Sequence, residues 1–173
     1  YAKYENVRVT IPRTVVVATD YFDAFIRNNG LEYVLTTEMT DEEILSEFVS
    51  STLPYKLREA LKAYVRTVSG PLAVRSSSKL EDSHYQPFAG IYSTYMIPYT
   101  EGNEDRQLRL LQKAIKSVYA STYFAASKAY VQSSQNLIAE EKMAVVIQEV
   151  CGTEQDGLFF PTLSGVARSI NYY

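Results

Sequence analysis

An arginine followed by a polar loop is the feature of this sequence best suited to chemistry. Arg75 comes at the end of the apolar run Leu72–Val74, and the serines Ser76–Ser78 follow it. A guanidinium offers a rigid fork of N–H donors that matches phosphate and carboxylate oxygens. The loop runs on to Gly90, and such loops can aim backbone N–H groups at phosphate oxygens while a glycine permits close approach of a ligand. The segment is therefore a candidate anion site.

The same arginine has a second interpretation from its surroundings. Glu81 and Asp82 follow six and seven residues later. A guanidinium that pairs with either carboxylate would tie the loop to the strand and bind nothing else. Spacing alone does not separate an anion-binding role from this tethering role.

Extended segments must position these side chains. They are predicted at residues 7–18, where Pro12 introduces a bend, and at residues 72–77, 91–97 and 143–150. The run MAVVIQEV at 143–150 is almost continuously apolar, which indicates a central strand. Residues 157–160 and 165–170 are predicted to form a final hairpin.

Helical periodicity appears between these strands. Thr19 is expected to cap a first helix that Gly30 ends. Thr40 and Glu43 have the spacing of a capping box before a second helix. Further helices are predicted from Pro54 to Val68, with the proline in the first turn, and over residues 104–130, where Tyr119, Tyr123 and Tyr130 are expected to pack against the core.

Composition limits the classes of function. The 173 residues are 46% hydrophobic and 21% charged, as in a soluble globular domain, and the formal net charge is −3. A negative balance argues against nonspecific binding to nucleic acid or to a membrane surface, but a local positive site still allows a nucleotide. No apolar run has the length of a membrane span and no signal peptide is visible, so a cytoplasmic location is expected.

The single cysteine, Cys151, cannot form a disulfide within one chain or a multi-cysteine metal site, and a small buried thiol is expected. The chain begins without methionine at Tyr1 and stops at Tyr173. We expect residues 1–173 to be part of a domain in a larger multidomain protein, with no internal boundary.

The order of motifs around Arg75 resembles a known family. Val74-Arg75-Ser76-Ser77, Glu81-Asp82, Phe88-Ala89-Gly90 and then Thr94 look like the signature of the ATP-binding domain of the phosphoenolpyruvate synthase and pyruvate phosphate dikinase family. VTIPRTVVVATDYFDAFIRNNGL is similar to the family's Val-Pro-Pro-Gly-Phe strand and following helix. AVVIQEVCGTEQDGLFFPT is similar to its Val-Val-Val-Gln-Met segment and following strand, so the resemblance extends over essentially the whole chain.

The resemblance implies an α+β fold: one lobe of an ATP-grasp-type nucleotide-binding domain, with a mixed sheet and flanking helices. It implies that Arg75 contacts the phosphates of ATP, that Gly90 and Thr94 line the triphosphate, and that Gln148 borders the adenine. An amide can donate and accept together, which suits an adenine edge. A hydrogen-bonded core amide is the alternative for Gln148.

Departures from the family pattern indicate a divergent branch. The family usually has Ser-Ala-Thr-Ala-Glu-Asp where this chain has residues 77–82 as Ser-Ser-Lys-Leu-Glu-Asp, and Lys79 could add a phosphate contact. Gln86-Pro87 replaces Ala-Ser, and Phe160-Pro161-Thr162 replaces Phe-Thr. These differences weaken an assignment of the substrate by analogy.

The resemblance also places essential parts outside this sequence. These are a Gly-Gly-Lys motif, the carboxylate and glutamine that hold Mg²⁺, a carrier domain with a phosphohistidine, and a barrel that binds pyruvate. The only histidine, His84, is expected to be a solvated loop residue and not the carrier. The 173 residues alone are therefore expected to be inactive.

For the parent enzyme the resemblance implies ATP-dependent phosphorylation of pyruvate through a phosphohistidine, giving phosphoenolpyruvate, AMP and phosphate. Phosphotransfer to another acceptor, such as an antibiotic or a glucan, is one alternative. A nucleotide-sensing domain without chemistry is another. The full-length sequence would discriminate these alternatives. A carrier segment together with a barrel would support the synthase, and a carrier segment without a barrel would support another acceptor. The absence of both segments would support the sensor.

Overall fold

The computed structural model describes residues 9–78, 81, 92–133, 142–167 and 169. Its main sheet has the strand order β1-β4-β2-β3, and all three strand pairs are antiparallel. The strands of this sheet are β1 (Thr14–Val17), β2 (Leu72–Ser78), β3 (Tyr95–Ile97) and β4 (Met143–Glu149). The predicted α+β class and the central position of β4 are confirmed. The prediction of a mixed sheet is wrong, because no described pair is parallel.

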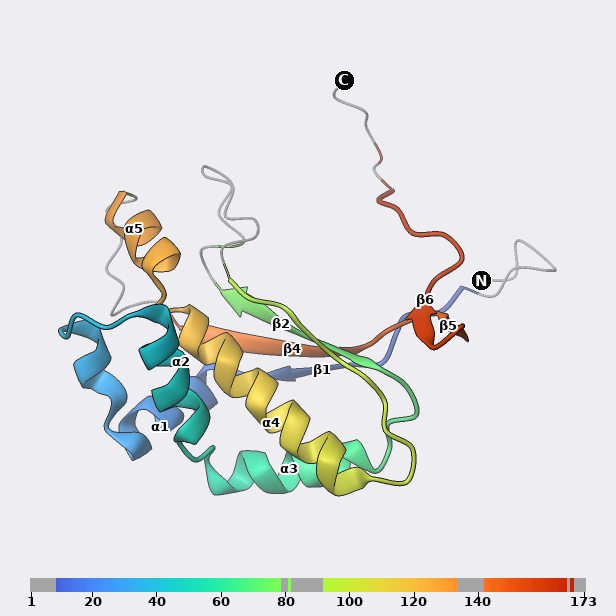
Figure 1. The fold of residues 1–173 in the computed structure, drawn as a ribbon, viewed down its shortest axis with the longest axis horizontal. Helices are drawn as coiled ribbons and strands as arrows, with labels where there is room; N and C mark the ends of the chain where they lie inside the picture. Colours follow the sequence, from blue (N-terminus) through green and yellow to red (C-terminus); the bar gives the residue numbers. More distant parts are fainter. Residues whose placement is uncertain (1–8, 79–80, 82–91, 134–141, 168, 170–173) are drawn as a thin grey trace.

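Helices cover one side of this sheet (Figure 1). The described helices are α1 (Thr19–Asn29), a 3₁₀ helix (Leu31–Leu35), α2 (Asp41–Ser50), α3 (Tyr55–Val65), α4 (Glu104–Ser121) and α5 (Ala125–Ser133). In the picture α1 to α4 lie together on the same side of β1, β4 and β2, and α4 runs across the middle of this layer. The domain therefore has two layers, a sheet and a helical layer, in its described part.

The core fills the space between the two layers. Alternate residues of β2 and β4 point into it: Leu72, Val74, Met143, Val145 and Ile147, which are all fully buried. They meet a cluster of aromatic rings from the helices, formed by Phe22, Phe25, Phe48, Tyr119 and Tyr123. Burial of this apolar surface, at about 25 cal/mol per Å², fixes which face of each strand points to the helices.

Two of the predicted helix ends are confirmed and one is wrong. Thr40 and Glu43 form the reciprocal capping box at the start of α2. Gly30 ends α1 with φ 62°, a left-handed conformation that favours glycine. Thr19 does not cap α1, because Ala18 occupies the N-cap position without a side-chain hydrogen bond and Thr19 is already helical.

The predicted helix over residues 104–130 is interrupted. It ends at Ser121, and α5 starts at Ala125. The Ala125 N–H donates to Asp41 Oδ1 at 2.8 Å, and the Ser127 hydroxyl donates to the Ser121 carbonyl at 2.7 Å. These side chains form hydrogen bonds with backbone groups at the break, so ending α4 and starting α5 here costs little free energy. Periodicity could not reveal it, because Asp41 is distant in sequence.

The other boundary differences are small. The helix predicted from Pro54 to Val68 is α3, which ends at Val65, with Pro54 at its N-cap. Only residues 95–97 of the segment 91–97 form a strand, residues 92–94 do not, and residue 91 lies outside the described residues. Within 7–18 the strand begins after Pro12, at Thr14, and residues 7 and 8 lie outside the described residues.

The final hairpin lies earlier in the chain than predicted. It is formed by β5 (Thr153–Gln155) and β6 (Leu158–Phe160). The turn residues Asp156 and Gly157 have φ of 51° and 78°, as a two-residue hairpin turn requires. Residues 165–167 and 169 belong to no strand, and residues 168 and 170 lie outside the described part. Cys151, just before this hairpin, is exposed, so the expectation of a buried thiol is wrong.

A partly buried lysine joins two helices of the layer. Lys116 of α4 donates to the carbonyl oxygens of Val49 and Ser51, the latter at 3.1 Å. These carbonyls lie at the C-terminal end of α2, where no intrahelical donor is available. Burial lowers the pKa of Lys116. The ammonium thus completes the end of α2 from a neighbouring helix.

We expect Lys116→Met to lower the free energy of unfolding by about 1–3 kcal/mol, because two partly buried carbonyls lose a charged donor while the apolar stem is kept. Lys113→Met is the matched control, since Lys113 lies exposed on the same helix. Its effect should stay within about 0.5 kcal/mol. Urea unfolding of both variants measures the difference, and equal effects would contradict the capping role of Lys116.

Candidate functional site

The side of the sheet opposite α1 to α4 carries two of the residues that the sequence singled out, Arg75 and Gln148. Strand alternation places Ala73, Arg75 and Ser77 of β2 on this side, because Leu72 and Val74 face the core. Directly paired residues share a face, so the strand register identifies the remaining members. We call this surface the open face; its residues are Thr14, Val16, Ala73, Arg75, Ser77, Met96, Ala144, Val146 and Gln148.

The register arranges the open face in rows across the strands. One row contains Thr14, Gln148, Ala73 and Met96, and the next contains Val16, Val146 and Arg75. Arg75 and Gln148 are therefore diagonal neighbours on adjacent strands, a relation in which side chains start about 7–8 Å apart. Long side chains reach a common ligand from such positions.

Of the two loop residues of the predicted site, Thr94 lies among the described residues and Gly90 does not. Thr94 is exposed and directly precedes β3. The β2–β3 register, which pairs Val74 with Tyr95, would place it opposite Arg75 if continued by one residue. Gly90 lies outside the described residues, as do Lys79, Asp82 and His84.

Arg75 is exposed and makes no ion pair or hydrogen bond with another described residue. It borders a hollow of about 250 Å³ together with Ser76, Ser77, Glu81 and Val146. Glu81 does not pair with it. Its two carboxylate oxygens instead accept hydrogen bonds from the Ser76 hydroxyl and the Ser78 N–H, both at 2.9 Å. Of the two carboxylates considered as partners of Arg75, Glu81 thus binds Ser76 and Ser78 instead.

Gln148 lies half-buried on the open face and not in the core. Its Nε2 donates to Thr14 Oγ1 at 3.0 Å. No described residue donates a hydrogen bond to its Oε1. Gln148 is therefore not a fully hydrogen-bonded core amide. Its Nε2 has a partner, whereas its Oε1 remains available as an acceptor on the open face.

Apolar residues on the open face were missed in the sequence. Val16 and Met96 are 59% and 63% exposed, and Val146 lies between Val16 and Arg75. A flat apolar surface beside an arginine and an amide offers contact area for an aromatic ring. The valine run of β1 is uniform, so its alternation could not be seen. The register of β4 was needed to assign Val16 to this face.

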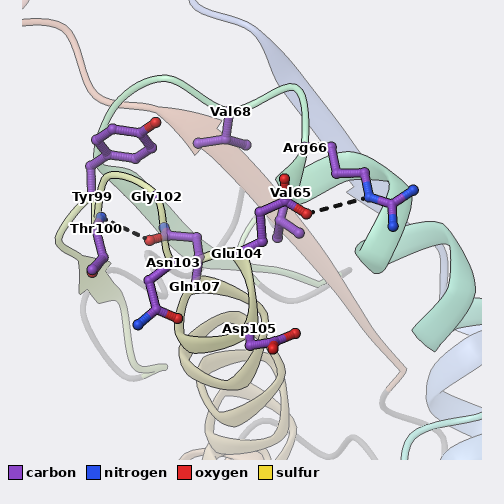
Figure 2. Close-up of a pocket in the computed structure, with 10 residues that line it drawn as sticks. All are labelled: Val65, Arg66, Val68, Tyr99, Thr100, Gly102, Asn103, Glu104, Asp105 and Gln107. Atoms are coloured by element: carbon purple, nitrogen blue, oxygen red, sulfur yellow. Dashed lines mark hydrogen bonds and ion pairs between the residues drawn. The ribbon is translucent and has the colours of Figure 1, made fainter.

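A larger hollow lies away from the open face, at the start of α4 (Figure 2). It has a volume of about 360 Å³ and lies between the end of α3, the loop at residues 99–103 and the first turn of α4. Gln107 Oε1 accepts from the Thr100 N–H at 3.2 Å, and Arg66 Nε lies 3.4 Å from Glu104 Oε2. These contacts hold the loop against the helices. We favour the smaller hollow at Arg75 because it contains an arginine with no described anionic partner.

Two further properties concern metal ions and membrane-spanning helices. In the part of the chain that the structure describes, no group of three or more His, Cys, Asp or Glu residues is placed to hold a metal ion. None of the described helices combines the length and apolarity needed to cross a membrane.

The fold and the open face define an α+β domain whose antiparallel sheet presents an arginine without a described anionic partner, an amide and apolar side chains. Residues 2–173 match the family model described as the AMP/ATP-binding domain of pyruvate phosphate dikinase. The chain belongs to this family.

Two curated relatives are similar to the chain over most of its length. The first is "Uncharacterized phosphotransferase YvkC" of Bacillus subtilis, 31% identical over 157 residues, which are 87% of this chain and 17% of the relative. The second is "Phosphoenolpyruvate synthase" of Aeropyrum pernix, 29% identical over 174 residues, which are 88% of this chain and 20% of the relative. The chain thus spans a fifth or less of the length of these relatives.

Arg75 and Glu81 should differ in their effect on stability. We expect Arg75→Ala to change the free energy of unfolding by less than about 0.5 kcal/mol, since the side chain is exposed and has no partner among the described residues. Glu81→Ala should cost about 1–3 kcal/mol, because the Ser76 hydroxyl and Ser78 N–H lose a charged acceptor. Glu101→Ala, at an exposed carboxylate without a described partner, is the control. Thermal unfolding provides the comparison, and a large loss in Arg75→Ala would restore the tethering interpretation.

Proposed function

We propose that the open face binds ATP, with the phosphates at Arg75 and the adenine near Gln148. The observation that carries this proposal is Arg75, which is exposed on a sheet face and has no described anionic partner in a chain of an AMP/ATP-binding family. An unpaired guanidinium offers charge-assisted, bidentate hydrogen bonds to phosphate oxygens. Thr94, and Gly90 outside the described residues, would line the triphosphate.

The rest of the open face suits the remainder of the nucleotide. Val16, Val146 and Met96 offer apolar contact to a flat ring. Gln148 Oε1 offers a hydrogen-bond acceptor at a diagonal position from Arg75. The open face therefore offers a charged region for the phosphates and an apolar region for the aromatic base.

We further propose that the described part is one lobe of an ATP-grasp-type domain and that residues 1–173 are part of a larger enzyme. That enzyme would transfer a phosphoryl group from ATP through a phosphohistidine carrier domain to pyruvate, giving phosphoenolpyruvate, AMP and phosphate. Support comes from the relative named phosphoenolpyruvate synthase. Mg²⁺, held by residues outside these 173 residues, would neutralise phosphate charge. The proposed enzyme is cytoplasmic.

Another acceptor is the second candidate. The relative with the higher identity is named only as a phosphotransferase. Since the acceptor would bind outside the open face, the residues described here are compatible with pyruvate, an antibiotic or a glucan. The products of the intact protein therefore decide between the candidates.

The reaction can be tested directly with the intact protein, ATP and Mg²⁺. With pyruvate present, we expect phosphoenolpyruvate, AMP and phosphate in equal amounts, measured by phosphorus NMR. AMP formation that does not respond to pyruvate but responds to another acceptor would support the second candidate. Binding of ATP with no turnover under any of these conditions would contradict both enzymatic proposals.

Arg75 should matter more for the rate than for the fold. Loss of a charge-assisted hydrogen bond costs about 1.5–3 kcal/mol, and each 1.4 kcal/mol corresponds to about tenfold. We expect Arg75→Ala to lower kcat by about 10- to 100-fold, because charge on the phosphoryl oxygens changes during transfer. Arg75→Lys should recover part of the loss, since it keeps the charge but not the planar fork.

Arg109→Ala is the matched control for this experiment, because Arg109 lies exposed on α4, in the helical layer. Steady-state kinetics and thermal unfolding should be measured on the same preparations. Normal kcat in Arg75→Ala, with the fold intact, would rule out the assigned role.

A further inference from the structure

A chain of two hydrogen bonds fixes the orientation of the Gln148 amide. The Pro12 carbonyl can only accept, and the Thr14 hydroxyl donates to it at 3.0 Å. Because a hydroxyl has one proton, Thr14 Oγ1 can then only accept from its other neighbour. That neighbour is Gln148 Nε2, which donates to Thr14 Oγ1 at 3.0 Å. The carbonyl half of the amide, Oε1, is thereby turned away from Thr14.

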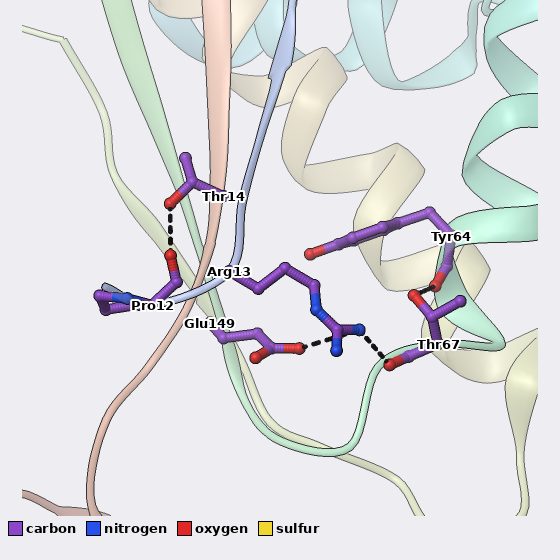
Figure 3. A network of polar contacts seen from close by, with 6 residues as sticks. All are labelled: Pro12, Arg13, Thr14, Tyr64, Thr67 and Glu149. Atoms are coloured by element: carbon purple, nitrogen blue, oxygen red, sulfur yellow. Dashed lines mark hydrogen bonds and ion pairs between the residues drawn. The ribbon is translucent and has the colours of Figure 1, made fainter. Parts of the chain in front are cut away.

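The backbone beside Thr14 is anchored on the helical side of the sheet (Figure 3). Arg13 Nη1 donates to the Thr67 carbonyl at 2.7 Å and lies 3.8 Å from Glu149 Oε1. The Glu149 N–H donates to the Arg13 carbonyl at 3.0 Å. In the picture the Arg13 side chain points toward Tyr64 and Thr67, and the Thr14 side chain points toward Pro12. These contacts hold the register that pairs Thr14 with Gln148.

We propose that Thr14 is the specificity-determining residue for the nucleobase, because it holds Gln148 with its carbonyl oxygen toward the ligand. A fixed acceptor selects a purine with an exocyclic amine at position 6, which is a donor. A 6-oxo purine presents an acceptor at that position, so two acceptors would face each other unpaired. Sites built to hydrogen-bond one group reject an analogue that lacks it. This inference rests on the proposed function, namely that the base lies near Gln148.

Without Thr14 the Gln148 amide can rotate. Its Nε2 would then be able to donate to a 6-oxo group as readily as its Oε1 accepts from a 6-amino group. Selectivity for adenine is therefore assigned to the pair of residues and not to Gln148 alone. Thr14 is a positioning residue, since it acts on the base through Gln148.

The test measures the affinities of the intact protein for ATP and for inosine triphosphate, which carries a 6-oxo group in place of the amine. We expect the unchanged protein to favour ATP. Thr14→Val keeps the shape but not the acceptor, and should lower the ratio of ATP affinity to inosine triphosphate affinity by about tenfold, from one hydrogen bond. Thr14→Ser, which keeps the hydroxyl, should restore the ratio. Isothermal titration supplies the affinities.

Thr153→Val is the matched control. Thr153 Oγ1 also accepts from a glutamine Nε2, that of Gln155, at 3.2 Å, but on the hairpin strand β5. Its loss should leave the ratio unchanged. If Thr14→Val weakens both nucleotides equally, Thr14 has only a structural role and the proposal is overturned.

Gln148→Leu gives an independent test should Thr14→Val fail to fold. It removes the acceptor directly, and the affinity ratio should fall by about the same factor. An unchanged ratio in Gln148→Leu would also overturn the proposal. The proposed function is judged separately, by Arg75→Ala. If ATP binds and Arg75→Ala lowers kcat while the Thr14 and Gln148 variants keep the affinity ratio, only the specificity inference fails. If neither nucleotide binds the unchanged protein, the proposed function fails.

Discussion

The backbone ladder between β2 and β4 is the interaction on which the rest of this domain depends. It runs from Leu72 opposite Glu149 to Ser78 opposite Met143, and β1 extends the sheet from the other edge of β4. The ladder determines at once which side chains enter the core and which reach the open face. Val74 and Ile147 are both fully buried, and their neighbours Arg75 and Gln148 consequently share the opposite side.

The helical layer keeps this sheet in place through side chains that complete backbone groups elsewhere in the fold. Lys116 binds carbonyls at the end of α2, Asp41 accepts from the first N–H of α5, and Arg13 joins β1 to the turn after α3. Each contact connects elements that are distant in sequence. The sheet that presents the open face is thus connected to the helices by hydrogen bonds between distant elements, which favours precise placement of Arg75 and Gln148.

Local patterns in the sequence predicted what depends on local physics. The capping box at Thr40, the glycine end of α1 and the apolar central strand were found because neighbours in sequence determine them. The break between α4 and α5 was not predicted because the side chain that caps α5 is Asp41, which is distant in sequence. The exposure of Cys151 was not predicted because the average burial of cysteine does not determine the burial of one particular residue.

The candidate site shows the same division between local and distant effects. Arg75 was visible from its position at the end of an apolar run, whereas the neighbourhood of Thr14 and Gln148 depends on the pairing of strands about 130 residues apart. Val16 and Met96 belong to the open face for the same reason, so no local pattern could assign them. The resemblance to a family supplied Gln148, but only the register supplied its partner.

Because the helices α1 to α4 lie on one side of the sheet, the parity of a residue number in β2 and β4 tells which side its side chain faces. In β2 even-numbered positions such as Val74 face the helices and odd-numbered ones such as Arg75 face outward, and in β4 the parity is reversed. Deleting or inserting one residue within either strand would exchange the two sets beyond that point. During evolution, substitutions can therefore change the side chains of the open face while the core is kept, but a change of strand length alters both faces together.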